Sequence, residues 1–281
     1  MQKNITKLGA VLRPNTPNIT CLFSKIKEDF AKEKIEVILE EESQQETINT
    51  AFLPFETLVK QVDAMISIGG DGTLISLLRK LHPYSISAFG INIGNLGFLT
   101  AINPSQSIEF ASALRQGRYK LNAHTTLEAS INNGPKKIAI NEFLISKNNL
   151  VSGILKIQAF IDSEIFNTYH ADSLIIATPT GSTAYNISAG GPIVYPLCKN
   201  ILLTPVAAHT LTQRPMVLHE CTLQFKINMQ GFLIIDGQDK IPITPDDITT
   251  IKIAQNPSYL LQKENRSYFQ ILKEKFQWGQ Q

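Results

Sequence analysis

The stretch AMISIGGDGTLISLLRKL, residues 64–81, joins an apolar run to a helical pattern through a turn of three glycines and one aspartate. A buried strand followed by a tight turn and a helix is the repeating unit of a parallel α/β sheet. The pattern predicts a strand over 64–68 and a helix from Thr73 to about Leu81. Glycines let a ligand approach the backbone, and the N–H groups at a helix start attract phosphate. This stretch therefore predicts an α/β domain with an anion site at the turn.

The same alternation continues on both sides of the turn and predicts a Rossmann-like parallel sheet flanked by helices over residues 1–100. The predicted strands are 7–12, 36–39 and 86–91, and the predicted helices are 18–33 and 47–61.

The pattern changes near residue 100, where one more helix at 104–116 is followed by β-rich segments. These segments predict a β-sandwich or a related all-β layer over residues 101–264, interrupted by a short helix at 181–189. The apolar spacing of the last residues predicts a helix over about 265–281 that packs back on the first domain. The β-rich segments are 119–131, 136–147, 153–162, 172–178, 221–228, 231–236 and 248–254.

The composition is that of a globular protein: of 281 residues, 43% are hydrophobic and 18% are charged. The net charge of +2 is spread along the chain, which excludes a nucleic-acid arm and a polybasic membrane anchor. The N-terminal apolar run breaks at Arg13, and no later run reaches about 18 apolar residues. We therefore expect a cytoplasmic protein without a membrane segment.

Metal and disulfide frameworks are not expected. Cys21, Cys198 and Cys221 are far apart and show no C-x-x-C spacing, which is typical of reduced thiols. The five histidines show no paired metal-ligand spacing, and they are His82, His124, His170, His209 and His219.

Asp71 has two interpretations. A carboxylate would repel a phosphate, so its place in an anion site suggests that it binds a hydroxyl or magnesium beside that phosphate. An ionised Asp71 can accept a proton from an attacking hydroxyl. The alternative is that Asp71 caps the helix that begins at Thr73. The turn alone leaves both open.

Other polar segments add candidate ligand sites. The segment TPTGSTAYNISAGGP, 178–192, offers the hydroxyls of Thr180, Ser182 and Thr183 and a stacking face on Tyr185, although a simple capped turn explains it equally well. Asn141–Glu142 and Asp172 lie at the starts of apolar strands, where a carboxylate suits ribose hydroxyls, or is merely a solvated strand end. His170 lies two residues before Asp172. Neither G-x-G-x-x-G nor a P-loop occurs.

Taken together, these segments resemble the NAD kinase family, which phosphorylates the adenosine-ribose 2′-hydroxyl of NAD to give NADP. The family's motifs occur in order from residue 64 to residue 238. Diacylglycerol and sphingosine kinases and phosphofructokinases carry turns similar to GGDGT, and the long TPTGSTAY segment separates NAD kinases from these families. The motifs are GGDGT (69–73), NIGNLGFLT (92–100), NE (141–142), TPTGSTAYNISAGGP (178–192), RP (214–215) and DGQ (236–238).

The resemblance implies an α/β domain and a β-sandwich with the active site between them. It implies that Asp71 is the general base on the 2′-hydroxyl, and that the transferred phosphate faces Gly69, Gly70, Gly72 and Thr73. Asp172 and Ala207, the latter from a neighbouring subunit, would lie near the nicotinamide. The residues implied to bind NAD are Asp71, Gly72, Asn141, Glu142, His170, Asp172, Thr183, Ala184, Tyr185, Asn186, Ile187, Ser188, Ala207 and Gln238.

The resemblance further implies ATP or polyphosphate as the phosphate donor, magnesium carried on that donor, no nucleic-acid or membrane partner, and a homodimer or homotetramer. Two segments depart from the family pattern: His170-Ala-Asp172-Ser173 replaces the common Arg-Gly-Asp-Gly, and LTQRP lacks the frequent serine after leucine. The first departure concerns the end of the dinucleotide that decides between NAD and NADH. The rival functions are a lipid or sugar kinase that shares GGDGT, and a dinucleotide-sensing module without turnover.

Overall fold

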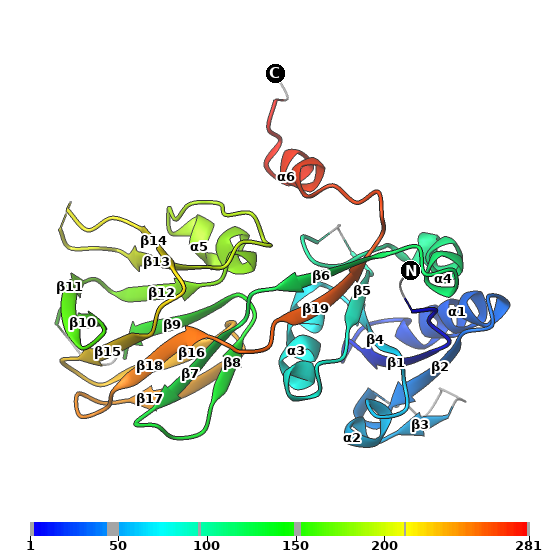
Figure 1. Ribbon diagram of the computed structural model, residues 1–281, viewed down its shortest axis with the longest axis horizontal. Helices are drawn as coiled ribbons and strands as arrows, with labels where there is room; N and C mark the ends of the chain where they lie inside the picture. The colour runs from blue at the N-terminus through cyan, green and yellow to red at the C-terminus, as the bar shows by residue number, and fades with distance from the viewer. Residues whose placement is uncertain (1–2, 44–50, 95–96, 149–152, 211, 280–281) are drawn as a thin grey trace. The chain divides into compact units, whose positions relative to one another are not determined.

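The protein is represented by a computed structural model that describes residues 3–43, 51–94, 97–148, 153–210 and 212–279 (Figure 1). The chain forms two compact units. One comprises Met1–Asn122 together with Tyr259–Gln281, and the other is Ala123–Ser258. The second unit is therefore inserted into the first, whose last strand and helix come from the end of the chain.

The first unit is built on a seven-stranded sheet of order β3-β2-β1-β4-β5-β19-β6. The strand pairs from β3 to β19 are parallel. The chain leaves β1 toward β2 on one side and later returns to pair β4 on the other, so the strand order reverses between β1 and β4. In open α/β sheets, ligands bind at the carboxyl ends of the strands at such a reversal. The strands are β1 Lys7–Leu12, β2 Glu36–Glu40, β3 Phe52–Leu53, β4 Ala64–Gly69, β5 Ala88–Asn92, β6 Lys120–His124 and β19 Ser258–Gln262.

Helices of this unit pack their apolar faces on the sheet and on each other. In α1, the buried residues Phe23, Ile26 and Phe30 recur at helical spacing. Phe89 of β5 lies between Phe30 and Phe110 of α4, with ring centroids 6.2 Å and 5.1 Å apart. These contacts fix α1 and α4 against the sheet. The helices are α1 Ile19–Lys32, α2 Phe55–Leu58, α3 Asp71–Leu81, α4 Ser107–Arg115 and α6 Tyr268–Phe276.

The second unit consists of two six-stranded sheets with antiparallel pairs, of order β11-β10-β15-β18-β7-β8 and β14-β13-β12-β9-β16-β17. Alternation along the strands directs one face inward: Leu223 and Phe225 of β15 are buried in the same core as Leu233 of β16, in the other sheet. The two sheets therefore share one apolar core, as in a β-sandwich. The elements are β7 Leu127–Ile131, β8 Lys137–Ala139, β9 Glu142–Lys147, β10 Lys156–Ile161, β11 Glu164–His170, β12 Ser173–Ala177, α5 Tyr185–Ser188, β13 Asn200–Val206, β14 Met216–His219, β15 Leu223–Ile227, β16 Gly231–Ile235, β17 Asp239–Ile243 and β18 Thr249–Ile253.

The fold class predicted from the sequence is confirmed, while several elements differ. The helix expected from Thr73 begins at Asp71. The helix expected over 47–61 is wrong in its described part, where β3 is followed by the one-turn α2; residues 47–50 lie outside the described residues. The segment expected as one β-rich run at 119–131 is divided between β6 and β7, which belong to different sheets.

The first unit extends beyond residue 100 to Asn122. The reason is that α4 packs on α1 and β6 is a strand of the first sheet. The C-terminal helix α6 belongs to this unit, and its Phe276 ring lies 5.8 Å from that of Phe98.

Candidate functional site

The glycine turn follows β4 at the reversal of strand order. The N–H of Arg13, just after β1, donates to the carbonyl of Ile68 at 2.9 Å, which holds the carboxyl ends of β1 and β4 together. Gly70 is the N-cap of α3 and has extended backbone angles. A Cβ added at Gly70 would meet no atom within 4 Å, whereas one at Gly69 would collide with the Thr73 side chain. The turn therefore packs tightly at Gly69 and opens at Gly70, beside the start of a helix where anions are favoured.

Asp71 is the first residue of α3, and its carboxylate binds another loop. The N–H of Phe98 donates to Oδ2 at 2.7 Å, and the N–H groups of Leu99 and Thr100 donate to Oδ1 at 3.2 Å and 3.0 Å. Gly97 lies so close that a Cβ there would collide with this carboxylate. Asp71 makes no capping hydrogen bond to α3, so the capping interpretation is not what the structure shows. Three of roughly four acceptor directions of the carboxylate are used, and one is left.

Arg266, which precedes α6, holds the other side of the same loop. Its guanidinium donates to the carbonyls of Phe98 at 2.7 Å and of Gly97 at 3.3 Å, and also to the carbonyl of Thr100. Burial lowers the pKa of Arg266 to about 10, and the charge of Asp71 opposes this shift. Arg266 is therefore a cation at neutral pH. No sequence signal pointed to it.

A second carboxylate organises the loop before β9 in the sandwich unit. Asp236 accepts the N–H groups of Ile140, Asn141 and Glu142 at 3.0, 2.8 and 3.0 Å. Burial, and next the neighbouring Asp236, raise the pKa of Glu142 to about 8. Its Oε2 is buried and has no hydrogen-bond partner among the described residues. At neutral pH Glu142 is therefore a neutral acid that can donate a hydrogen bond. Asp236 lies in the DGQ segment, but its anchoring role was not predicted.

The segment 178–192 packs directly against this loop. The Thr178 hydroxyl donates to the carbonyl of Ile140 at 2.7 Å, and its N–H donates to the carbonyl of Asn141 at 2.8 Å. A Cβ added at Gly181 would strike the carbonyl of Asn141. The candidate residues Asn141 and Glu142 are thus brought next to the candidate segment 178–192.

Within this segment, some predicted ligand residues have structural partners and others face outward. The Asn186 side chain is buried, donates to the carbonyls of Ser182 and Pro192, and accepts from the Thr204 hydroxyl at 2.6 Å. These hydrogen bonds stabilise the turn of residues 182–192. By contrast, Tyr185 is 43% exposed and Ser188 is exposed, so both are accessible to a ligand. Thr183, Ala184 and Ile187 are half-buried beside them.

Asp172, just before β12, lies close to two basic side chains, Lys147 and His209. Lys147 Nζ lies 2.5 Å from its Oδ1, and His209 Nε2 lies 3.7 Å from the same oxygen. The hydrogen bond from Lys147 is the main cause that lowers the pKa of Asp172. Its N–H donates to the carbonyl of Val206 at 3.0 Å, next to Ala207, which has a φ of 50°. Asp172 and Ala207 of one chain are therefore neighbours, and Lys147 is a partner that sequence reasoning missed.

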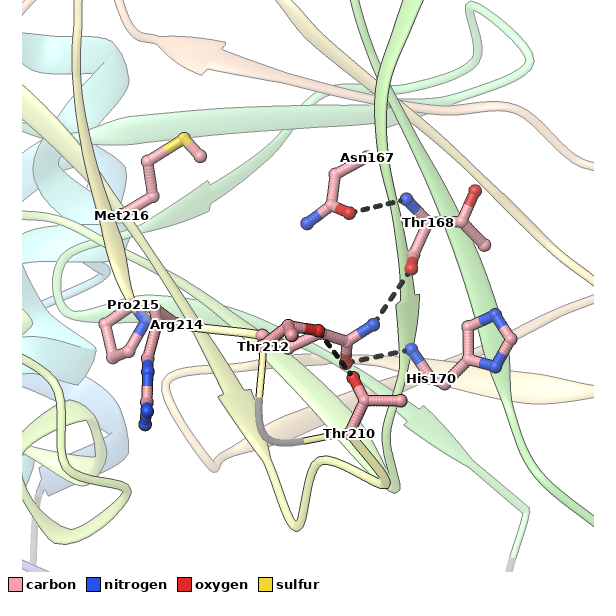
Figure 2. A pocket seen from close by; sticks show the side chains of 9 residues that line it. Asn167, Thr168, His170, Thr210, Thr212, Arg214, Pro215 and Met216 are labelled. Atoms are coloured by element: carbon pink, nitrogen blue, oxygen red, sulfur yellow. Dashed lines mark hydrogen bonds between the residues drawn. The ribbon is translucent and has the colours of Figure 1, made fainter.

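His170 lines a pocket of about 450 Å³ in the sandwich unit (Figure 2). Gln213, which precedes β14, connects residues 212–215 to β11, because it accepts the N–H of His170 at 3.1 Å and donates to the carbonyl of Thr168 at 2.9 Å. His170 is the only predicted site residue among those that line this pocket. Gln238 lies exposed in the turn between β16 and β17.

The described residues include no group of three or more His, Cys, Asp or Glu side chains arranged to hold a metal ion. In the same residues, no helix combines the length and apolarity that a membrane span requires.

The α/β domain has a glycine turn and an acid at its strand reversal, and the β-sandwich has a second cluster of polar loops. The class of protein is a phosphotransferase that acts on an alcohol group. The profile of the ATP-NAD kinase N-terminal domain matches residues 18–119, and that of the ATP-NAD kinase C-terminal domain matches residues 140–262. The chain belongs to the NAD kinase family. Its activity is the phosphorylation of NAD with ATP as phosphate donor.

Relatives and solved structures agree with this assignment. The chain is 48% identical to the NAD kinase of Helicobacter hepaticus, with 99% of the chain and 97% of the relative covered. It is 41% identical to that of Wolinella succinogenes, with 98% and 97% covered. A crystal structure of an NAD kinase from Archaeoglobus fulgidus in complex with ATP has a TM-score of 0.76 at 25% identity, covering 96% of this chain and 98% of that one. Yeast NADH kinase complexed with NADH has a TM-score of 0.87 at 22% identity, covering 100% and 90%, and so shares the fold.

Proposed function

We propose that Asp71 is the general base that takes the proton of the adenosine-ribose 2′-hydroxyl of NAD as that oxygen attacks the terminal phosphate of ATP. The observation that supports this role is the position of the carboxylate: it lies at the strand reversal, next to the open face of Gly70, with one acceptor direction left. Phosphoryl transfer depends mainly on positioning and on neutralising charge. A fixed carboxylate beside a glycine turn meets the first need.

The phosphates would lie against Gly69, Gly70, Gly72 and Thr73. Magnesium bound to the donor would neutralise negative charge on the phosphate oxygens. Because Asp71 retains only one acceptor direction, we expect phosphate oxygens and water to supply most of the ligands of that ion. Polyphosphate is the alternative donor.

The dinucleotide would be bound by the polar loops of the sandwich unit. Neutral Glu142 can donate a hydrogen bond to a ribose oxygen, and exposed Tyr185 offers a face for the adenine. Asn186 would contribute only its backbone, because its side chain is buried and both its amide nitrogen and its carbonyl oxygen already have partners. The remaining contacts proposed for NAD are Asn141, Thr183, Ala184, Ile187, Ser188, His170, Asp172, Ala207 and Gln238.

Cytoplasmic location and a homo-oligomeric state complete the proposal. The three cysteines, all among the described residues, form no disulfide, which fits a reducing compartment. Ile165 on edge strand β11 is 54% exposed and Val217 on edge strand β14 is 45% exposed. Apolar side chains on open sheet edges suit contact with a second copy of the chain.

The test is NADP formation by the purified protein with magnesium and either ATP or polyphosphate, together with the variant Asp71→Asn. We expect turnover of the wild type and a loss of about 10²–10⁴-fold in kcat for the variant. The amide also turns an N–H toward the N–H of Phe98, so we expect a stability loss of about 1.5–3 kcal/mol. Urea denaturation separates this loss from the chemical effect.

Two results would contradict the proposal. A folded Asp71→Asn protein with near-normal kcat would show that Asp71 is not the base. Calorimetric binding of NAD by the wild type without any NADP formed would indicate a sensing module instead of an enzyme.

A further inference from the structure

Loop 97–100 lies between the Arg266 guanidinium and the Asp71 carboxylate, both in the first unit. The peptide units Gly97–Phe98 and Phe98–Leu99 each give their N–H to Asp71 and their carbonyl to Arg266. In a trans peptide these two groups point in opposite directions. Each peptide dipole is therefore aligned from the guanidinium to the carboxylate.

This arrangement fixes the carboxylate as well as the loop. Charge-assisted hydrogen bonds are short and strong, and here they act on both ends of the same rigid peptide planes. If the carbonyls turned, the N–H groups would turn with them and leave Asp71. The orientation of Asp71 thus depends on Arg266, although the two side chains make no direct hydrogen bond to each other.

The C-terminal segment contacts the same loop at a second point. The ring of Phe276, at the end of α6, lies 5.8 Å from the ring of Phe98. Ser267 caps α6 by accepting the N–H of Gln270 at 3.3 Å, which fixes the start of the helix next to Arg266. The segment from Arg266 to Phe276 is therefore docked on loop 97–100 at two points.

We propose that Arg266 is a positioning residue for phosphoryl transfer, which orients the Asp71 carboxylate through the peptide groups of loop 97–100. This inference rests on the proposed role of Asp71. A shift of about 1 Å in a reacting group is enough to cost about 10²-fold in rate. Arg266 acts on the alignment of the base and not on substrate binding.

The test measures kcat and KM for both substrates in Arg266→Ala, Arg266→Lys and Lys275→Ala. Arg266→Ala should lose about 10²-fold in kcat, with KM values within about threefold of wild type. The kcat of Arg266→Lys should lie between those of wild type and Arg266→Ala, because an ammonium keeps the charge but cannot span three carbonyls. Millimolar guanidinium should restore part of the kcat of Arg266→Ala. Lys275→Ala removes the same charge from an exposed position on α6 and should behave as wild type.

A double variant separates this inference from the role of Asp71. If Arg266 acts through Asp71, Arg266→Ala should lower kcat no further in an Asp71→Asn background. An equal loss in both backgrounds, a near-normal kcat of Arg266→Ala, or a loss confined to KM would overturn the inference. A near-normal kcat of Asp71→Asn alone would instead contradict the base assignment. Thermal melting of each variant shows whether a loss of rate is due to unfolding. A loss that is due to unfolding and that guanidinium does not reverse would also overturn the inference.

Discussion

At the scale of single residues, the site depends on close backbone approaches that only glycine allows. The buried Gly97 contacts the Asp71 carboxylate directly, and a methyl group there would overlap it. Gly94, three residues earlier, has open space where its Cβ would be. Neither glycine has a φ in the left-handed region, so the difference between them is one of space and not of backbone strain.

We therefore expect Gly97→Ala to destabilise the protein by about 2–4 kcal/mol, because the methyl group separates the loop from Asp71 and breaks its hydrogen bonds. Gly94→Ala should change stability by less than about 1 kcal/mol. Urea denaturation of both variants checks this. Equal stabilities of the two would mean that the contact between Gly97 and Asp71 is not tight.

Glu142 predicts a pH dependence of stability. Its folded pKa of about 8 exceeds the ordinary glutamate pKa of 4.5, so the folded state keeps a proton that the unfolded state loses. The contribution of Glu142 to stability is greatest below about pH 4.5 and falls as the pH rises toward about 8. At pH 7 this destabilisation is on the order of 3 kcal/mol.

Glu142→Gln removes the titration and should make the protein more stable at pH 7.5 than the wild type, with little difference at pH 4.5. Denaturation curves at both pH values measure the effect. Glu164→Gln, which changes an exposed glutamate on β11, serves as the control and should change stability at neither pH. If the difference in free energy of unfolding between Glu142→Gln and wild type were the same at both pH values, Glu142 would be ionised in the folded protein at pH 7.5.

At the scale of elements, periodicity predicted what local sequence determines. The strand β4, the glycine turn and α3 were expected because an apolar run, a turn and a helical pattern follow one another directly. The start of α3 was placed two residues late, since Gly70 serves as N-cap without a side chain that would mark it. Strands β11, β13, β14, β17 and β19 were not predicted. Of these, β11, β14, β17 and β19 are short or partly polar and are stabilised by their neighbours in the sheet. β13 is a buried apolar strand that contains Pro205, a residue that counts against a strand in a sequence pattern.

The candidate site shows the same division. Asp71 was found because it lies inside a recognisable turn. Its partners were not found, because Phe98 is 27 residues away and Arg266 reaches carbonyls 166 to 169 residues away. A single sequence carries no local pattern for such a pair. Asp236 illustrates an intermediate case: its segment was noted as a motif, but its three hydrogen bonds to residues 140–142 required the hairpin of β16 and β17.

At the scale of the whole molecule, the two units differ in how the chain completes them. Ala123–Ser258 is one continuous segment with its own apolar core. The other unit needs both chain ends, because β19 lies between β5 and β6 in its sheet. Without residues 259–281, that sheet loses an internal strand and loop 97–100 loses Arg266.

We therefore expect the fragment 123–258 to fold by itself, whereas the fragment 1–122 should not form its native sheet. An independent core and continuous connectivity are what a segment needs to fold alone, while an unpaired β6 and an exposed edge of β5 favour aggregation. Dispersed amide NMR spectra and a cooperative thermal transition would identify a folded fragment. Adding back 259–281 to fragment 1–122 by a short linker in place of residues 123–258 should restore a cooperative transition. A disordered 123–258 fragment, or a native-like 1–122 fragment, would show that the units do not have separate requirements for folding.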